Sequence, residues 1–399
     1  MVARSGGKQR SRLAYRMRRL QAKARRLFSV ELWGAPSLVH PLFDAPRPRV
    51  RRTRAPTPVD PALVSRIADN FRRADADFNT QSPSMWQKIE SNNQAFTGAL
   101  RQGDAPGLQR QFETLFQDEL LGGFGHRESL YFGENRWRPG FQELRMTDML
   151  LSLGEALGVL NLPNHVQMNL LDYVDFVHTD QDRLLADIEA RLGFSLVMPL
   201  VGNPPVFRLN GVSTSADMVR HAYVAFRLRQ LGLNPEDPIV EIGGGFGSLA
   251  LLAHRAGFRN YTIIDLPYVG AIQTFFLGTA LGPDAVSGYG EPEKAIRLLP
   301  PPAIKDIGNG SVAMVINMDS LPEIGEPEAG AYIREIGRIS RLFLSINQEA
   351  QAYIPDVGPQ LVVPDLVASV DGFRLMHRSR YWMMEGYVEE LYRIERSRG

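Results

Sequence analysis

The residues that most restrict the fold of this chain are 238–252, which read PIVEIGGGFGSLALL. A short apolar stretch, 239–242, predicts a buried strand, and an apolar helix is predicted from Ser248. Between them lies a glycine turn, made of Gly243, Gly244, Gly245 and Gly247. Glycine lets the backbone approach a ligand closely, and the start of the helix points its free amides at the same place. The segment therefore predicts a ligand site between strand and helix.

A second apolar strand ends in an acid a short distance along the chain. Residues 261–267 read YTIIDLP, so Asp265 follows Gly243 by 22 positions. In dinucleotide-binding folds, an acidic residue about 20 positions after the glycines binds ribose hydroxyls. The two linked motifs predict a ligand that contains a nucleoside. A glycine turn that only packs helix against strand is the alternative.

The acid before the glycines separates two kinds of ligand. The dinucleotide fingerprint GxGxxG requires glycine where this chain has Ser248. The chain instead carries Glu241 two places before the first glycine, in the pattern ExGxGxG. This pattern resembles the first motif of class I S-adenosylmethionine-dependent methyltransferases. A carboxylate also attracts a cationic methionine group and repels a pyrophosphate. We therefore favour methyl transfer over an NAD-dependent oxidoreductase, which stays an alternative.

Strands and helices alternate after Pro235. Strands are expected at 239–242, 260–265, about 285–288, 312–317, 342–346, 373–381 and 388–394, with helices between most of them. The last two strands have no helix between them, so the final strand is expected to pair antiparallel through a short loop. The predicted fold class is α/β: a Rossmann-like, seven-stranded sheet of the class I methyltransferase type, preceded by a mainly helical domain.

The chain divides by composition into three parts. Residues 1–60 are expected to form a basic, largely disordered arm and Pro/Arg-rich linker, 61–234 a helical cap or dimerisation domain, and 235–399 the Rossmann-like domain. A helix is expected from about Ala216 to Leu231. The break from Pro199 to Gly211 either lines the cleft or only connects two elements. A homodimer through the helical domain is one expectation.

Charge is distributed unevenly along the chain. Residues 1–54 hold 15 Lys or Arg against Glu31 and Asp44, a net charge of +13, whereas residues 55–399 hold 30 basic and 42 acidic groups, a net charge of −12. Apolar and basic residues within 12–27 fall on different faces of a helix, which suits peripheral contact with an anionic membrane. A solvated arm, a nucleic-acid contact and a transit peptide are the alternatives. The acidic body argues against nucleic acid.

The absence of cysteine excludes disulfides and cysteine-ligated metals. The seven histidines are scattered, so no metal site is expected. No run of 18 apolar residues occurs, and no apolar signal core follows the basic start. The expected location is cytoplasmic, with contact at the inner face of the membrane through the arm as an option.

Polar side chains follow the fourth and fifth strands of the predicted sheet. Asn317, Asp319 and Glu323 follow the fourth strand, and Glu349 follows the fifth. Ligands of open α/β sheets bind outside the carboxyl ends of the strands. A carboxylate there is suited to remove the proton of an acceptor hydroxyl, so Asp319 and Glu323 are the candidate catalytic bases. A helix cap for Asp319 and a solvated surface position for Glu323 are the alternatives.

Four segments together resemble a known family. EIGGGFGSLA, YTIIDLP, INMDSLPE and FLSINQE, in this order, are similar to the sugar O-methyltransferase family of bacterial polysaccharide and glycoconjugate clusters. The resemblance covers roughly residues 200–395 and does not reach the basic arm. Phe246 and Ser248 stand where tyrosine and glycine are expected.

The resemblance implies an enzyme of class EC 2.1.1, with S-adenosylmethionine as donor and a saccharide or glycoconjugate hydroxyl as acceptor. Asp265 would bind the ribose diol, and Leu266 would pack on the adenine. The remaining cofactor residues implied are Glu241, Gly243, Gly245, Gly247 and Asn317. The candidates for acceptor contact are Tyr268, Gln273, Tyr289 and Glu349. Arg380, Tyr381 and Trp382 are further candidates, but Tyr381 and Trp382 alternate within a predicted strand and suit the apolar core at least as well. A non-sugar small-molecule acceptor, or a regulatory domain that binds nucleic acid through the arm, are the other hypotheses.

Overall fold

The computed structural model describes residues 44–52, 58–78, 89–91, 93–117, 140–161, 170–209, 211–349, 353–354, 358–384 and 386–395. The predicted amphipathic helix of the basic arm lies outside the described residues. No helix among those described is long and apolar enough to cross a bilayer.

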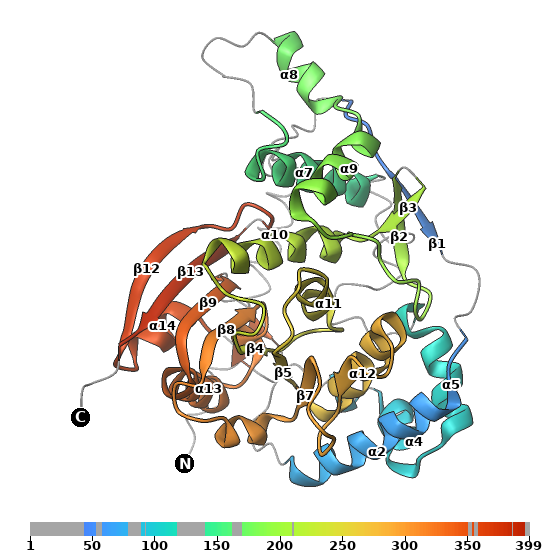
Figure 1. Ribbon diagram of the computed structural model, residues 1–399, viewed down its shortest axis with the longest axis vertical. Helices are drawn as coiled ribbons and strands as arrows, with labels where there is room; N and C mark the ends of the chain where they lie inside the picture. Colours follow the sequence, from blue (N-terminus) through green and yellow to red (C-terminus); the bar gives the residue numbers. More distant parts are fainter. Residues whose placement is uncertain are drawn as a thin grey trace, which may run out of the picture.

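The centre of the molecule is a mostly parallel sheet, shown in Figure 1. Its eight strands run in the order β12-β13-β9-β8-β4-β5-β7-β6. Their bounds are β4 Ile239–Ile242, β5 Tyr261–Ile264, β6 Val286–Ser287, β7 Ile296–Leu299, β8 Val312–Met318, β9 Ser340–Gln348, β12 Phe373–Arg380 and β13 Tyr387–Ile394. Strand β13 lies between β9 and β12 and is antiparallel to both. The predicted Rossmann-like α/β class and the antiparallel final strand are confirmed.

The predicted number of seven strands is wrong by one. Strand β7, Ile296–Leu299, pairs parallel with β5, and the two-residue strand β6 pairs with β7 at the edge. Strand β7 escaped prediction because it is a four-residue stretch, IRLL, between a charged run and a proline run. Strands this short carry too little alternation to be recognised by pattern.

Helices cover both faces of the sheet and explain its continuous apolar strands. On β4, Ile239 belongs to the apolar cluster shared with α10 (Ala216–Gln230), α11 (Ser248–Arg255) and α12 (Pro267–Leu281). Its neighbour Val240 belongs to the opposite cluster, with α13 (Glu326–Ile339) and α14 (Val363–Ala368). Successive side chains of a strand point to opposite faces, so every residue of β4, β5 and β8 is buried. The expected helix from about Ala216 is confirmed as α10.

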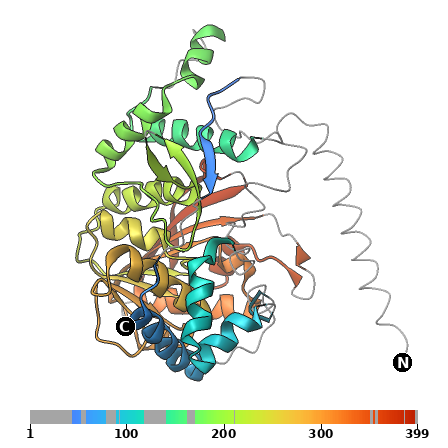
Figure 2. The same ribbon diagram turned by 90° about the vertical axis from the view of Figure 1, so that its right-hand side faces the viewer.

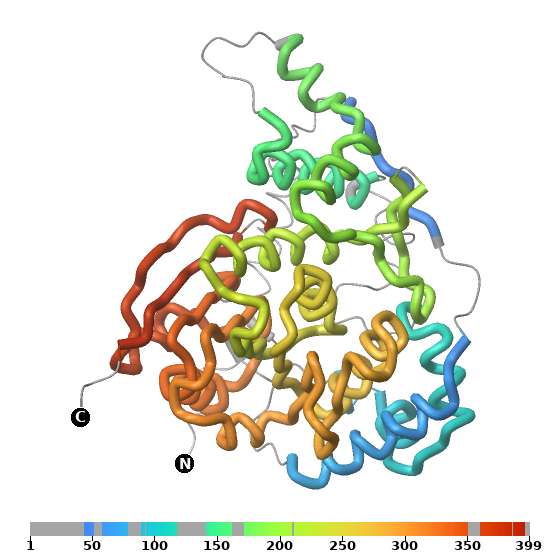
Figure 3. Tube along the Cα trace, in the orientation of Figure 1, coloured from blue at the N-terminus to red at the C-terminus, as the bar shows by residue number. Residues whose placement is uncertain are grey.

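The preceding region is mainly helical. Its helices are α2 Pro61–Asp77, α4 Gln94–Gln102, α5 Ala105–Glu113, α7 Phe141–Ala156, α8 Leu170–Val177 and α9 Gln181–Leu192. Helix α2 packs on α12, and the ring of Phe112 in α5 stacks on Phe275 at 4.3 Å between centroids. In Figure 2, α2, α4 and α5 gather beside α12, whereas Figure 3 shows α8 projecting at the far end of the long axis. The predicted boundary near residue 234 is thus crossed by one continuous apolar core.

A small antiparallel sheet accompanies the helices. It is formed by β1 Arg49–Arg52, β2 Pro205–Leu209 and β3 Val212–Thr214, in that order. Strand β1 falls inside the segment expected to be a disordered linker, so that expectation is wrong for residues 49–52. Their extended, proline-flanked sequence pairs with β2. The Pro199–Gly211 break contains β2, and none of its described residues lines the large cavity at the carboxyl ends of the parallel strands.

Candidate functional site

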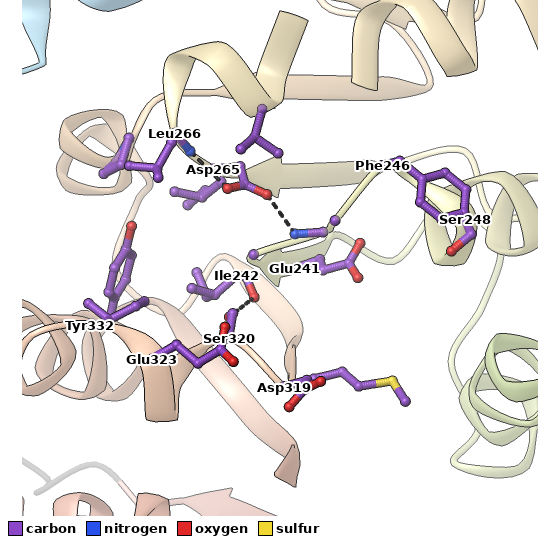
Figure 4. A pocket seen from close by; sticks show the side chains of 18 of the residues that line it. Glu241, Ile242, Phe246, Ser248, Asp265, Leu266, Asp319, Ser320, Glu323 and Tyr332 are labelled. Atoms are coloured by element: carbon purple, nitrogen blue, oxygen red, sulfur yellow. Dashed lines mark hydrogen bonds between the residues drawn. The ribbon is translucent and has the colours of Figure 1, made fainter. Parts of the chain in front are cut away.

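A cavity of about 440 Å³ opens at the carboxyl ends of β4, β5 and β8. This volume lies within the range of small-molecule sites, roughly 300–1,000 Å³. In Figure 4, Leu266 and Tyr332 lie toward one end, and Ser248 and Asp319 toward the other. The residues that line the cavity include Phe78, Asp217, Arg220, His221, Glu241, Gly243, Gly244, Gly245, Phe246, Ser248, Asp265, Leu266, Asp319, Glu323, Glu328, Tyr332 and Met384.

The glycine loop forms one wall of the cavity at Gly243 to Gly245. Gly243 has φ +71°, and a Cβ there would lie 2.2 Å from Oγ of Ser320. No side chain fits at that point, and an L-residue is strained at this φ. Gly247 differs: it does not line the cavity, and its added Cβ would meet Leu277 of α12 at 2.9 Å. Its predicted contact with a cofactor is replaced by close packing of α11 on α12.

Asp265 follows β5 and reaches across to the glycine loop. Its Oδ2 accepts from the amide of Gly244 and from Nε2 of Gln273, both at 2.9 Å, and its Oδ1 accepts from the amide of Leu266 at 2.9 Å. Burial raises the pKa of Asp265 to about 7, although these three hydrogen bonds oppose the rise. A carboxylate accepts about four hydrogen bonds, so capacity remains for a ligand hydroxyl.

Glu241 lies deeper in the same wall, in the middle of β4. Its side chain is buried and lines the cavity, and the phenol of Tyr261 donates to its Oε2 at 2.9 Å. Burial raises the pKa of Glu241 to about 8; the charge of Asp265 adds to the rise and the Tyr261 hydrogen bond opposes it. A cation in the cavity would favour the ionised form.

Asp319 follows β8 and lines the opposite wall. It is one of two described non-glycine residues with positive φ, at +68°, a conformation that clusters at functional sites. Its amide donates to the carbonyl of Ile346 at 3.0 Å and to Oδ1 of Asn347 at 3.1 Å, and its Oδ1 accepts from the phenol of Tyr387. Burial raises the pKa of Asp319, while Tyr387 and Arg220 lower it.

Asp319 and Glu323 both line the cavity, so the structure brings the two candidate bases together. Glu323 ends the 3₁₀ turn Leu321–Glu323. The N-cap residue of that turn is Ser320, with no side-chain cap hydrogen bond, so the alternative role of Asp319 as a cap is not seen. Asn317, in contrast, does not line the cavity. Its Nδ2 donates to the carbonyl of Ile242 at 2.9 Å and to Oγ of Ser320, which ties β8 to β4 below the loop.

The four predicted acceptor residues do not line the cavity. Tyr268 is fully buried in the core. Gln273, also buried, donates from Nε2 to Asp265 and to the carbonyl of Gly245, so it positions the glycine loop. Tyr289 donates to Asp77 at 2.9 Å, and Glu349 pairs with Arg378 at 2.9 Å. The predicted acceptor contacts of these four residues are therefore replaced by contacts within the protein.

Helix α10 supplies a polar wall that the motifs did not indicate. Asp217, Arg220 and His221 fall on one face of this helix and line the cavity. Arg220 forms an ion pair with Asp217, and its Nε is buried without a hydrogen-bond partner among the described residues. Nδ1 of His221 lies 2.6 Å from Oγ of Ser248. The available signal was the spacing 217, 220, 221 on a largely buried helix just before the first strand.

The cavity is strongly acidic. Its described lining contains six carboxylic acids against one arginine and one histidine; the acids are Asp217, Glu241, Asp265, Asp319, Glu323 and Glu328. Arg220, the single arginine, is already paired with Asp217. Such a site suits a ligand with cationic groups and one carboxylate better than a ligand with several phosphates.

The chain matches no family model and no curated protein. Among solved structures it is similar to the Burkholderia thailandensis 1,6-didemethyltoxoflavin-N1-methyltransferase, with 16% identity and a TM-score of 0.33 over 45% of this chain and 79% of that one. It is also similar to a Pyrococcus horikoshii protein provisionally assigned as an RNA methyltransferase, with 14% identity and a TM-score of 0.32 over 46% and 85% of the two chains. Scores this low carry no argument about activity or substrate.

Proposed function

We propose that this chain is an S-adenosylmethionine-dependent methyltransferase that methylates a saccharide hydroxyl. One observation supports S-adenosylmethionine as the methyl donor: the glycine loop, Glu241 and Asp265 line one cavity at the ends of β4 and β5. The saccharide acceptor comes from the family resemblance of the four sequence segments. No described residue of the cavity selects a sugar over another hydroxyl compound, so the acceptor needs its own experiment.

The residues that line the cavity suit each part of S-adenosylmethionine. Asp265 has acceptor capacity for the ribose hydroxyls, and Leu266 and Tyr332 offer apolar surface for the adenine. The acidic lining suits the sulfonium and ammonium groups. Arg220, with its unpartnered Nε, is suited to the methionine carboxylate. At Gly243 a side chain would fill the approach to the loop.

The same residues argue against a dinucleotide. Ser248 occupies the position of the third fingerprint glycine, and its hydroxyl lies against His221. A pyrophosphate at the loop would lie beside Glu241, and the single arginine of the described lining, Arg220, is already paired with Asp217. The repulsion between the pyrophosphate and Glu241 would be strongest when Glu241 is ionised.

When bound, the donor would supply an electrophilic methyl group. The protein would align the acceptor oxygen with it, remove the hydroxyl proton and exclude water. In this proposal Asp319 accepts the proton on Oδ2, because Oδ1 already accepts from Tyr387. Phe78, Phe246 and Met384 supply apolar wall around the site.

Calorimetric titration with S-adenosylhomocysteine and, separately, with NAD tests the donor. We expect the protein to bind S-adenosylhomocysteine and not NAD. Asp265→Ala should weaken it by about 10- to 100-fold, the loss of charge-assisted hydrogen bonds. Tight binding of NAD alone would refute the proposal. Mass spectrometry of surface glycans from cells with and without the protein then tests the acceptor. Loss of one methyl group from a single sugar supports it, and unchanged glycans with a methylated non-sugar product overturn it.

A further inference from the structure

A second hollow, separate from the cavity, is lined by arginines. It has a volume of about 410 Å³ and lies between β1, β2 and the segment that begins α9. It shares no lining residue with the cavity. We call it the arginine groove, after Arg47, Arg49, Arg51 and Arg208, all of which are exposed.

Arg47, Arg49 and Arg51 form a row along one extended segment, and Arg208 lies beside this row on the neighbouring strand. Arg49 of β1 lies directly opposite Arg208 of β2 in the antiparallel pairing. Like charges placed opposite each other destabilise a sheet. Arg47 and Arg51 lie two positions before and after Arg49, so charges recur about every 6.6 Å along an extended chain. The sheet thus holds cations together at a cost to its own stability.

The described part of the chain neutralises the row only in part. Arg47, Arg49 and Arg51 form no ion pair there, and Arg208 donates to the carbonyl of Gly211 at 3.1 Å and to Ser213 at 3.3 Å. Two acids also line the groove, Asp180 and Asp182. Oδ1 of Asp180 accepts from the amides of residues 182 and 183, so this carboxylate caps α9. Four guanidinium groups against two carboxylates leave the groove with a net charge of +2.

The floor of the groove is ordered by buried contacts. Gln181 is buried, and its Nε2 donates to the carbonyl of Pro46 at 2.6 Å and to Oγ1 of Thr147 at 2.8 Å. Leu209 and Pro48 are also buried and line the groove. The segment that carries Arg47 is therefore fastened to α7 and α9. The guanidiniums extend from a fixed base rather than from a free strand.

The shape and lining of the groove select among polyanions. Among the described residues, no aromatic ring other than the imidazole of His178 lines it, whereas single-stranded nucleic acid is bound on stacking platforms. A bilayer presents a broad surface, and the groove is concave. A peptide that added to the free edge of β1 would use backbone hydrogen bonds, but the groove lies over side chains of both β1 and β2. An extended acid chain without bases fits best.

We propose that the arginine groove binds an acidic glycan, whose carboxylates pair with Arg47, Arg49, Arg51 and Arg208. Planar guanidinium groups bind carboxylates in bidentate fashion, which suits repeating uronates. The choice of a glycan rests on the saccharide acceptor of the proposed function. The groove would hold a distant part of the chain whose hydroxyl is methylated.

Fluorescence anisotropy with end-labelled oligogalacturonate tests this binding on the full chain at low salt, without donor. Arg49→Gln and Arg208→Gln should each weaken binding about fivefold, the effect of one exposed charged contact. Arg110→Gln removes one exposed charge from α5, outside the groove, and should change affinity less than twofold. The basic arm is present in every variant, so its contribution cancels in the comparison.

Thermal unfolding without ligand separates binding from folding. Arg49→Gln removes the repulsion from Arg208, so its unfolding temperature should equal or exceed that of the parent chain. Equal glycan affinity of Arg49→Gln and Arg110→Gln would overturn the proposal. So would groove variants that lose binding to oligothymidylate or to phosphatidylserine vesicles but keep binding to oligogalacturonate. Donor titration is a separate measurement, so its failure leaves this result unaffected.

Discussion

Tyr387 donates a hydrogen bond from its phenol to Oδ1 of Asp319. Asp319 follows the parallel strand β8, and Tyr387 begins β13 opposite Gln348, the last residue of β9. Because β13 runs antiparallel, its first residue lies at the edge of the sheet where the parallel strands end. Strand β13, which lies between β9 and β12, therefore brings a hydrogen-bond donor, the phenol of Tyr387, to the cavity.

Tyr387→Phe should move the acidic limb of the methyl-transfer pH profile to higher pH. The phenol lowers the pKa of Asp319, so its removal raises that pKa. Asp319 is then protonated, and unable to act as a base, up to a higher pH. The profile of kcat against pH measures the shift. Tyr392→Phe removes a phenol that donates to Glu390 on the same strand, away from the cavity, and should leave the limb in place. An unmoved limb in both variants would remove Tyr387 from this role.

Arg220→Gln should weaken S-adenosylhomocysteine binding by about 10- to 100-fold and leave 5′-methylthioadenosine binding unchanged. The second ligand lacks the amino-acid part, so the difference isolates the carboxylate contact. Isothermal titration gives both affinities. Arg220→Lys keeps a cation beside Asp217 and should restore part of the loss. An equal loss for the two ligands would show that Arg220 acts on the fold of the cavity instead.

Glu241→Gln should make the unliganded protein more stable than the parent at high pH. The folded pKa of Glu241 is about 8 against an ordinary value of 4.5, so ionisation penalises the folded state progressively between these values. The penalty is absent below about pH 4.5 and complete above about pH 8, where it is on the order of a few kcal/mol. Urea unfolding at about pH 5 and about pH 9 measures it. An equal fall in stability for parent and variant would contradict the assignment.

Glu291→Gln should destabilise the protein at neutral pH, by an amount that vanishes in acid. Oε1 and Oε2 of Glu291 accept from Nε and Nη2 of Arg66 in α2, at 2.7 and 2.5 Å. Burial raises the pKa of Glu291, but hydrogen bonds from Arg66, the Gly288 amide and Asn70 outweigh it and lower the pKa to about 2.

This stabilisation is present above about pH 4.5 and is lost as the pH falls toward 2. With partial solvent screening it is on the order of 2 kcal/mol at neutral pH. Chemical unfolding of parent and variant at several pH values gives the difference. A difference that stays constant down to about pH 3 would be inconsistent with ionisation of Glu291.

Gly243→Ala should be more destabilising than Gly257→Ala. Both glycines have positive φ, so each substitution strains the backbone by about 1–2 kcal/mol. A Cβ at Gly257 meets nothing within 4 Å, whereas at Gly243 it lies 2.2 Å from Ser320. The clash should add about 1–3 kcal/mol and abolish donor binding. Unfolding free energies and S-adenosylhomocysteine titration report the two effects. Equal destabilisation would mean that Ser320 moves aside freely.

The half of the cavity formed by the glycine loop and the two acids near it could be predicted from sequence because its parts are local. The glycine turn, Glu241 and Asp265 lie within one strand-turn-helix-strand segment, so their spacing alone brings them together. Asp319 and Glu323 were found because a buried strand turns abruptly polar after Asn317. In each case the chain itself carries the residue to the edge of the sheet.

The other half depends on contacts between distant segments, which spacing does not record. Asp217, Arg220 and His221 reach the cavity only because α10 packs beside α11, and Phe78 only because α2 packs on α12. Tyr387 requires the insertion of β13 between β9 and β12. Conversely, Tyr268 and Gln273 were misassigned because α12 is buried nearly all round, so a polar residue on it faces the core.

Phe78, the C-cap residue of α2, forms part of the cavity wall, although it lies more than 150 positions before the glycine loop. We therefore expect the Rossmann-like region alone to form an incomplete cavity. A truncated chain that began at residue 235 would keep the glycine loop but lack both Phe78 and the α10 wall. Engineering of a new acceptor preference should therefore begin in the N-terminal helices and leave the sheet untouched.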